Sequence, residues 1–425
     1  MKTIYTLLSV IIMAGLNLCA QTTSGWHQKQ PAGEYNKVWH LAEMSDDGQT
    51  IVIGNNSNQL FISTDGGGTW NEAITDASST KRNYKACAMS SDGSRIIVAK
   101  STGRIHYSGD RGANWVELQP LGSANKAWSS LAMSADGGVI VAAKSGLLDG
   151  LLYMSKDGGS TWNEVQPTGY EKENWNAVAI SDNGKIIVAG VYEESTYLST
   201  DGGDTWSQCP DDNGRNWVKS AMSADGSKIL LASTSRLYLS KNTGSTWQEV
   251  TPAGNDTYEW RVASMSNDGM KIIVGISELE GNGRLYYSMN GGNTWQETQP
   301  VGDENKRWEA GCINGDGSTI VVGVNGGNIY LNDSLLKSSG TSALRNNKKL
   351  SDIFVHPNPA QHCINLKNLN DASKISIYNL QGTMVKEINP HSTESIQISD
   401  LESGVYLISI YHKNKRTESL RFVKQ

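Results

Sequence analysis

Residues 63–70 read STDGGGTW, and this stretch places a carboxylate among three glycines beside a tryptophan. A carboxylate on flexible backbone can hold a cation, since hard cations prefer oxygen ligands. The same residues also suit a tight turn, because an Asp side chain accepts hydrogen bonds from nearby backbone N–H groups. The stretch is therefore a ligand loop, a metal site or a structural turn.

Five further copies of this stretch follow along the chain, and their variation favours the turn. Two copies carry Asn in place of Asp, and a neutral amide is a poor ligand for a hard cation. No Cys and His residues have the spacing of zinc ligands, so we expect no metal and no cofactor. The residues assigned to these structural turns are Ser63, Asp65, Gly67, Trp70, Asp110, Trp115, Asp157, Trp162, Asp201, Trp206, Asn242, Trp247, Asn290 and Trp295.

A second repeated phrase, EMSDDGQTIVIG at residues 43–54, precedes each turn and sets the repeat length. It contains a D-G or N-G pair, which is a strong signal for a tight hairpin. Its seven copies are spaced 42 to 48 residues apart, and four short strands per repeat of that length predict β-propeller blades. We call the central residue of each copy the anchor; the anchors are Ser45, Ser90, Ser134, Ser181, Ser223, Ser266 and Asn314.

The seventh repeat lacks its fourth strand, and the N-terminus contains a matching segment. Residues 25–39, GWHQKQPAGEYNKVW, align with residues 161–175, TWNEVQPTGYEKENW, so that Trp26 matches Trp162. We therefore predict an all-β fold, a seven-bladed β-propeller over residues 21–334 that is closed by an N-terminal strand. Closure would cover the strand edges that an open array exposes.

The pattern S-x-D-x-G-x-T-W resembles the Asp-box, or BNR repeat. This repeat is known from sialidases, some glucan hydrolases, sortilin-type receptors and the photosystem II assembly factor family. The resemblance implies a turn between the third and fourth strands of each blade, on the face opposite the ligand site. The working face would then carry the loops between blades and the loops between second and third strands.

An aromatic residue stands six positions before each anchor, at the end of each loop between blades. Such a ring of aromatics could stack on sugars, or it could fill the interfaces between blades. Strict sevenfold repetition favours packing, and sugar binding remains the alternative. These residues are Trp39, Tyr84, Trp128, Trp175, Trp217, Trp260 and Trp308.

Departures from the repeat are better clues to chemistry. Glu43 stands two positions before its anchor, where the other repeats have Ala, Ser or Cys. The residue five positions before the anchor differs in type from repeat to repeat. A glycoside hydrolase would need two carboxylates beside a cleft, or arginines that grip a substrate carboxylate. Glu43, Glu309 and Arg261 are the catalytic candidates, but no pair is singled out, and the R-I-P phrase of sialidases is missing. Other residues available to such a site are Glu259, Asp303, Arg82, Arg215 and Arg307.

The N-terminus has the pattern of a secretory signal peptide over residues 1–20. Lys2 supplies the positive start, residues 4–18 are apolar, and Ala20 offers a small residue before the cleavage point. A lipoprotein signal at Cys19 is the alternative, but Leu18 stands where such signals have a small residue. We expect cleavage after Ala20 and export across the inner membrane.

The C-terminus has a different composition. Residues 335–350 are polar and basic, as in a linker, and residues 351–425 alternate apolar and polar residues, which predicts a small Ig-like β-sandwich. This tail resembles the type A C-terminal sorting domain of the type IX secretion system, through Pro357-Asn358-Pro359, Ile377-Tyr378-Asn379 with Gly382, and Gly404-Val405-Tyr406-Leu407. The resemblance implies the type IX secretion machinery as a partner, and secretion or surface attachment. An ordinary accessory Ig-like module is the alternative.

The remaining properties narrow the function. The net charge is −6, and acidic and basic residues are mixed along the chain, which argues against a nucleic-acid partner. The cysteines do not stand at equivalent positions of the repeat, so they form no disulfide framework. We predict a secreted or cell-surface monomer, peripheral to the outer membrane at most, that acts as a non-catalytic binding or scaffolding module for an extracellular glycan or protein. A glycoside hydrolase is the alternative, and an assembly factor for a surface complex is the third hypothesis.

Overall fold

The structure is a computed structural model, and its strands form two compact units that divide between residues 338 and 339. The predicted signal peptide at residues 1–20 and most of the predicted linker lie outside the described residues. The described residues are 25–33, 37–57, 59–75, 84–123, 125–146, 150–169, 172–210, 214–278, 283–335, 355–356, 360–366, 372–379, 383–389, 395–412 and 417–424.

Six blades of the first unit are formed by consecutive stretches of chain, each with four antiparallel strands. The first three contain β2 (Lys37–Met44), β3 (Ile51–Asn55), β4 (Leu60–Ser63) and β5 (Asn71–Glu72); β6 (Tyr84–Met89), β7 (Ile96–Lys100), β8 (Ile105–Ser108) and β9 (Val116–Leu118); and β11 (Trp128–Met133), β12 (Ile140–Lys144), β13 (Leu151–Ser155) and β14 (Asn163–Val165). The short β10 (Pro120–Ser123) lies between the second and third blades. The next three contain β15 (Trp175–Ile180), β16 (Ile187–Glu194), β17 (Thr196–Ser199) and β18 (Ser207–Gln208); β19 (Arg215–Met222), β20 (Ile229–Ser233), β21 (Leu237–Ser240) and β22 (Gln248–Val250); and β23 (Trp260–Met265), β24 (Ile272–Ile276), β25 (Leu285–Ser288) and β26 (Gln296–Thr298).

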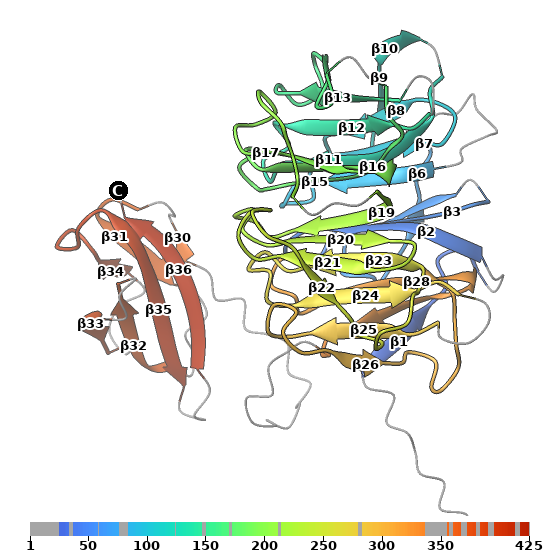
Figure 1. Cartoon of the computed structure of the whole chain (residues 1–425). Helices are drawn as coiled ribbons and strands as arrows, with labels where there is room; N and C mark the ends of the chain where they lie inside the picture. Colours follow the sequence, from blue (N-terminus) through green and yellow to red (C-terminus); the bar gives the residue numbers. More distant parts are fainter. Residues whose placement is uncertain are drawn as a thin grey trace, which may run out of the picture. The chain divides into compact units, whose positions relative to one another are not determined.

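The seventh blade combines both ends of the propeller chain. It contains β27 (Trp308–Ile313), β28 (Ile320–Gly327), β29 (Ile329–Asn332) and, as its outer strand, the N-terminal β1 (Trp26–Lys29). His27 lies opposite Leu331 as Asn163 lies opposite Met154 in the third blade, so β1 takes the place of β14. The blue β1 is seen among the orange strands in Figure 1. The predicted seven-bladed propeller, closed by an N-terminal strand, is confirmed.

A ring of backbone hydrogen bonds joins all seven blades at one end of the central channel. The N–H of the residue after each anchor donates to the carbonyl oxygen of its counterpart in the next blade, over N···O distances of 2.8–3.1 Å. The Gly315 N–H of the seventh blade donates to the Asp46 carbonyl oxygen of the first blade, so the ring closes without a gap. The members, in order, are Asp46, Ser91, Ala135, Asp182, Ala224, Asn267 and Gly315.

Glycine is required where the D-G turns meet the neighbouring blade. Gly93 has a φ of +70°, and a Cβ there would lie 2.5 Å from the Thr50 hydroxyl of the first blade. Gly48 at the closing interface also has a positive φ, +72°, but a Cβ there would meet the Thr319 hydroxyl of the seventh blade at 3.5 Å, an ordinary contact. Its backbone conformation alone therefore favours glycine.

The predicted Asp-box turns are held by local hydrogen bonds. The carboxylate of Asp65 accepts bonds from the Thr69 N–H at 2.8 Å, the Thr69 hydroxyl at 2.7 Å and the Ser63 hydroxyl at 2.8 Å. The Ser63 hydroxyl accepts a bond from the Gly67 N–H at 2.8 Å. Asp157 and Asp201 form the same set of bonds.

Asparagine supports the same turn with one bond reversed. Asn242 accepts the Thr246 N–H at 2.9 Å through its side-chain oxygen, while its side-chain amide donates to the Thr246 hydroxyl at 3.0 Å. Asn290 and Thr294 repeat this arrangement. Local hydrogen bonding therefore accounts for these positions without a ligand.

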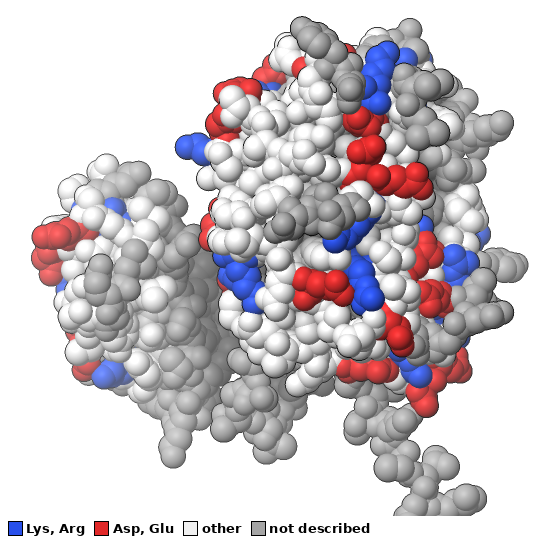
Figure 2. Space-filling view, in the orientation of Figure 1, with Lys and Arg blue, Asp and Glu red and all other residues white. Residues whose placement is uncertain are grey.

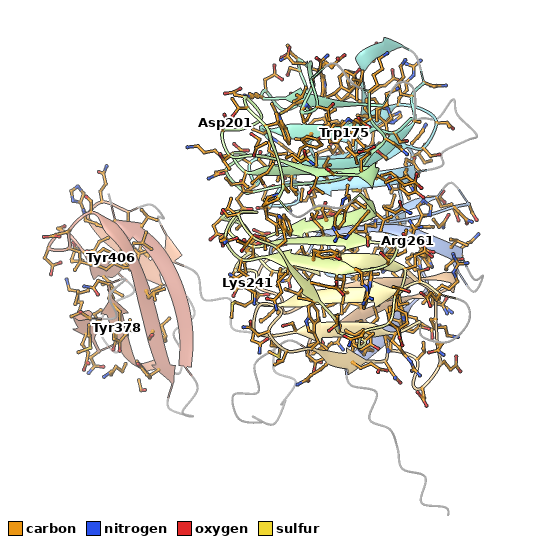
Figure 3. The ribbon with its side chains drawn as sticks, viewed as in Figure 1. Trp175, Asp201, Lys241, Arg261, Tyr378 and Tyr406 are labelled. Atoms are coloured by element: carbon orange, nitrogen blue, oxygen red, sulfur yellow. The ribbon has the colours of Figure 1, made fainter. Side chains whose placement is uncertain are left out.

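The Asp-boxes and the D-G turns lie at one end of the propeller. In the first blade the Gly66 N–H of the box donates to the carbonyl oxygen of Gln49, beside the D-G turn. We call this end the Asp-box face and the opposite end, with the loops between blades, the loop face. Figure 3 shows Asp201 and Lys241 at the left, on the Asp-box face, and Arg261 at the opposite end.

The seven repeated aromatic residues fill the interfaces between blades. They are only 0–3% exposed, and six of them meet an aromatic ring of the third strand edge-on, with centroids 5.7–6.2 Å apart. Packing is therefore the role that their burial supports, and no ring face is open for stacking on a sugar. These residues are Trp39, Tyr84, Trp128, Trp175, Trp217, Trp260 and Trp308.

The second unit contains two antiparallel sheets. One holds β30 (Val355–His356), β31 (Cys363–Leu366) and β34 (Ser395–Gln397), and the other holds β33 (Met384–Ile388), β32 (Ala372–Tyr378), β35 (Gly404–His412) and β36 (Thr417–Lys424). Ile364, Ile377, Ile408 and Phe422 belong to its buried core, as the predicted small β domain requires. Of the tail motifs, Tyr378 and Tyr406 are labelled in Figure 3, whereas Pro357–Pro359 and Gly382 lie outside the described residues.

The closing strand can be tested through Trp26, which is buried and donates to the Thr298 hydroxyl at 2.9 Å. We expect Trp26→Ala to lower the free energy of unfolding by about 3–5 kcal/mol, because it removes a large buried ring. His27→Ala, an exposed position on the same strand, is the control. Urea unfolding followed by tryptophan fluorescence reports on the propeller, since all 13 tryptophans lie in residues 26–308. Equal midpoints for the two variants would contradict the role of β1.

The Asp-box turn predicts a defined acid response. Hydrogen bonds, led by that from the Thr161 hydroxyl, lower the pKa of Asp157 to about 2, below the usual value of about 4 in unfolded chains. This stabilisation is therefore present above pH 4 and is lost as the pH falls through 2. We expect Asp157→Asn to cost less thermal stability than Asp157→Ala at pH 7. The difference in melting temperature between wild type and Asp157→Asn should shrink towards pH 2; a constant difference would refute this account.

Candidate functional site

The central channel is the main cavity on the axis of the propeller. It has a volume of about 270 Å³ and is lined by the first strands of the blades, β2, β6, β11, β15, β19, β23 and β27. Each first strand runs from a buried aromatic at the loop face to an anchor at the Asp-box face. Residues far apart in the sequence therefore face one another across this channel.

Each first strand contains a register shift five residues before its anchor. Such a bulge inserts an unpaired residue and redirects side chains, and bulges are common beside functional sites. We call these the bulge residues, and they coincide with the irregular sequence position. Five of the seven line the channel cavity: Lys85, Ser129, Asn176, Val218 and Arg261.

Three bulge residues connect neighbouring blades. The Ser129 hydroxyl donates to the carbonyl oxygen of Trp175 at 2.6 Å, and the Asn176 amide donates to that of Trp217 at 2.9 Å. His40 makes the equivalent contact with Tyr84 through its Nε2 atom, and burial lowers the pKa of His40. These polar side chains therefore have a structural role at the interfaces.

Two of the catalytic candidates are held in local networks. Arg261 forms an ion pair with Glu259, with Nε and Oε1 2.8 Å apart. Glu309 accepts bonds from the Ser277 hydroxyl at 2.8 Å and the Asn325 amide at 3.2 Å, and pairs with Arg307. Of these groups only Arg261 lines the channel cavity.

Lys219 is a channel residue that the sequence predictions did not include. It stands four residues before its anchor, where most other blades carry an apolar residue such as Leu41 or Val262. Lys219 is half-buried, lines the channel and makes no ion pair with the described residues. Burial, together with the charges of Lys85 and Arg261, lowers the pKa of Lys219 to about 8. A comparison of this position across the seven repeats would have identified it.

Glu43 lies in the same cavity as Lys219. It forms no ion pair with the described residues, and burial raises its pKa to about 7 while Lys219 acts in the opposite direction. The thiols of Cys87 and Cys312 lie near it, and burial raises the pKa of both thiols. An acid and a base that both titrate near neutrality therefore share this channel.

The two ends of the channel differ in charge. Lys85, Lys219 and Arg261 lie towards the loop face, whereas Asp46 and Asp182 belong to the hydrogen-bonded ring at the Asp-box end. Burial, followed by the charge of Asp46, raises the pKa of Asp182. On the surface seen in Figure 2, acidic and basic side chains are interspersed.

A second cavity, of about 310 Å³, lies on the loop face at the sixth and seventh blades. Its wall includes Glu278, Arg307 and the amides of Asn325 and Asn328. Arg307 and Asn325 also hold Glu309, the bulge residue of β27, so this amide-rich cleft lies beside the first strand of the seventh blade.

The other residues considered for catalysis do not gather at one site. Arg215 packs over the Tyr238 ring, 4.1 Å from its centroid, and Asp303 pairs with Arg284. Arg82 lies outside the described residues. Within the described ranges, no group of three or more His, Cys, Asp or Glu residues is arranged to hold a metal ion.

No helix that could span a membrane is present in the part of the chain that the structure describes.

Three solved structures with a similar fold are remote in sequence. A structure of YCF48 bound to a D1 peptide is 14% identical, covers 75% of this chain and 96% of its own, and gives a TM-score of 0.55. YCF48 from Cyanidioschyzon merolae is 16% identical, with coverages of 72% and 98% and a TM-score of 0.55. The GH74 enzyme of Niastella koreensis is 15% identical, with coverages of 93% and 74% and a TM-score of 0.59. At such identities the likeness shows the fold alone, and no curated protein matches the chain.

Family models assign both parts of the chain. Residues 20–329, well over half of the chain, match the photosynthesis system II assembly factor YCF48 model, and residues 354–425 match the secretion system C-terminal sorting domain. The resemblances to Asp-box propellers and to the type IX sorting tail are thereby confirmed, and the tail marks a secreted or cell-surface protein. The chain therefore belongs to the photosynthesis system II assembly factor YCF48 family and carries a secretion system C-terminal sorting domain at its end.

Proposed function

We propose that this propeller is a non-catalytic binding protein that holds a segment of an extracellular or surface protein on its loop face, as an assembly factor does. The observation that carries the proposal is the channel mouth, where Lys85, Lys219 and Arg261 converge from three blades. The sevenfold repeat is broken at these positions, whereas packing alone would favour the repeated residue types.

The character of the loop face supports a protein ligand over a sugar. Sugar sites use exposed aromatic faces, and the seven repeated aromatics here are buried between blades. The channel mouth and the adjoining cleft instead present ammonium, guanidinium and amide groups. Such groups donate hydrogen bonds to backbone carbonyl oxygens and to carboxylates. A related fold, that of YCF48, has been solved with a bound peptide.

A glycoside hydrolase is the second candidate function. One observation favours it: burial raises the pKa of Glu43 to about 7, as a general acid would require, and a GH74 enzyme shares the fold. The reaction also needs a second carboxylate facing the substrate. Glu309 is occupied by Ser277, Arg307 and Asn325, so it does not supply a free partner.

The binding function can be tested by photo-crosslinking in the native cells. We expect a photoreactive amino acid at Glu304, an exposed loop-face residue beside the cleft, to form one discrete adduct with a surface or secreted protein. The same label at Lys241, exposed on the Asp-box face, is the matched control. Mass spectrometry would identify the adduct. Equal adducts from both positions, or adducts from position 241 alone, would contradict the assigned face.

The hydrolase alternative gives a separate outcome. We expect the purified chain to release no product from fluorogenic sialosides or β-glucans above the rate of Glu43→Gln, because the other channel carboxylates, Asp46 and Asp182, belong to the hydrogen-bonded ring at the Asp-box end, away from the loop face. The measurement is the initial rate between pH 5 and pH 8. Turnover by the wild type that is abolished in Glu43→Gln would replace the binding proposal with catalysis.

A further inference from the structure

Three cationic side chains from separate blades face one small cavity. Lys85 comes from β6 of the second blade, Lys219 from β19 of the fifth and Arg261 from β23 of the sixth. Like charges placed close together disfavour one another, and the partial burial of Lys219 and Arg261 adds a desolvation cost, whereas Lys85 is more exposed. Such a cluster on the channel-lining strands becomes favourable when an opposite charge binds between its members.

The protein's own carboxylates leave this cluster partly unbalanced. Arg261 pairs with Glu259, and Glu309 is taken up by Arg307, Ser277 and Asn325. Among the described residues, no ion pair or hydrogen bond engages the side chains of Lys85 and Lys219. Glu43 is a channel carboxyl without an ion pair among the described residues, and it lies two positions nearer to its anchor than Lys219 does to its own. The mouth therefore offers two unpaired ammonium groups and one guanidinium group.

We propose that the channel mouth is a carboxylate-binding site in which Lys219, with Lys85 and Arg261, holds one carboxylate group of the partner segment. This inference rests on the proposed function and names the chemistry that its site recognises. Ammonium and guanidinium groups form short, charge-assisted hydrogen bonds with carboxylates. The cavity of about 270 Å³ has room for one side chain or one chain end and excludes a folded domain. The carboxylate can belong to an Asp or Glu side chain or to a free C-terminus.

The channel also predicts the direction of the pH dependence. Lys219 has a pKa of about 8 and is cationic below it; Glu43 has a pKa of about 7 and becomes neutral below it. Both protonations favour binding of a ligand carboxylate. Protonation of Lys219 adds a cation, and protonation of Glu43 removes an anion that competes with the ligand. The other groups around them are Lys85, Arg261, Glu309, His40, Cys87 and Cys312. Binding is therefore expected to weaken as the pH rises from 6 to 9.

The experiment uses the full chain and three glycine-rich pentapeptides in titration calorimetry. The first peptide has both ends blocked and one Glu side chain; the second has a free C-terminal carboxylate as its only charge; the third has blocked ends and no charge. We expect the first or the second to bind and the third to fail, and whichever binds identifies the source of the carboxylate. Binding of all three with equal affinity, or of none, would overturn the proposal.

Two variants assign the site. Lys219→Met keeps much of the side-chain volume and should weaken binding of the carboxylate peptide by about 10- to 100-fold, because one charge-assisted hydrogen bond is lost. Lys228→Met is the control on the same blade, since the Lys228 ammonium group binds the Asp268 carbonyl oxygen at the Asp-box face. Glu43→Gln should retain binding and remove the change in affinity around pH 7. Unchanged affinity in Lys219→Met, with a normal melting temperature, would refute the assignment.

The outcomes separate this inference from the proposed function. A discrete crosslink from position 304 combined with no carboxylate binding would leave a protein partner in place and remove the channel mouth as its carboxylate site. Carboxylate binding without any crosslink would retain the site and remove the protein partner.

Discussion

Closure of the ring is the constraint on which the rest of this structure depends. Strand edges left open expose unpaired N–H and C=O groups, and a circular array removes most of them. Here closure is achieved twice, by β1 pairing with β29 and by the ring of hydrogen bonds in which the Gly315 N–H meets the Asp46 carbonyl oxygen. The first strand of every blade is thereby fixed at the axis, and the size of the channel follows.

Additional strand pairing reinforces two of the seven interfaces. β2 pairs with β28 between the first and seventh blades, and β16 pairs with β19 between the fourth and fifth. Both pairings lie towards the loop face, because they use the ends of long second strands. The loop face is therefore held by backbone hydrogen bonds at these interfaces, as it also is between Gly103 and Lys126 of the second and third blades, and its side chains project from a hydrogen-bonded frame. A site that recognises a ligand precisely benefits from such preorganisation.

Repetition explains which features could be predicted from the sequence. The Asp-box depends on residues within seven positions of one another, so Asp65 and Asn242 disclose their hydrogen bonds in the local pattern. The closing strand was also predictable, since Trp26 is followed by Gln30-Pro31 at the same spacing at which Trp162 is followed by Gln166-Pro167. Lys219 was not predicted, because its neighbours Lys85 and Arg261 lie on other blades and a bulge decides which side chains enter the channel. The occupation of Glu309 by Ser277 and Asn325 likewise depends on contacts between elements.

The candidate site therefore exists only in the closed ring. Lys85, Lys219 and Arg261 are contributed by the second, fifth and sixth blades, and no local segment of the chain contains two of their first strands. They converge only when every blade is in place, which requires the N-terminal β1 to complete the seventh. Because desolvation and mutual repulsion make the cation cluster unfavourable on its own, the packing of the ring must supply the free energy that assembles it. A ligand carboxylate returns part of that free energy, so binding at the mouth and stability of the closed ring are thermodynamically linked.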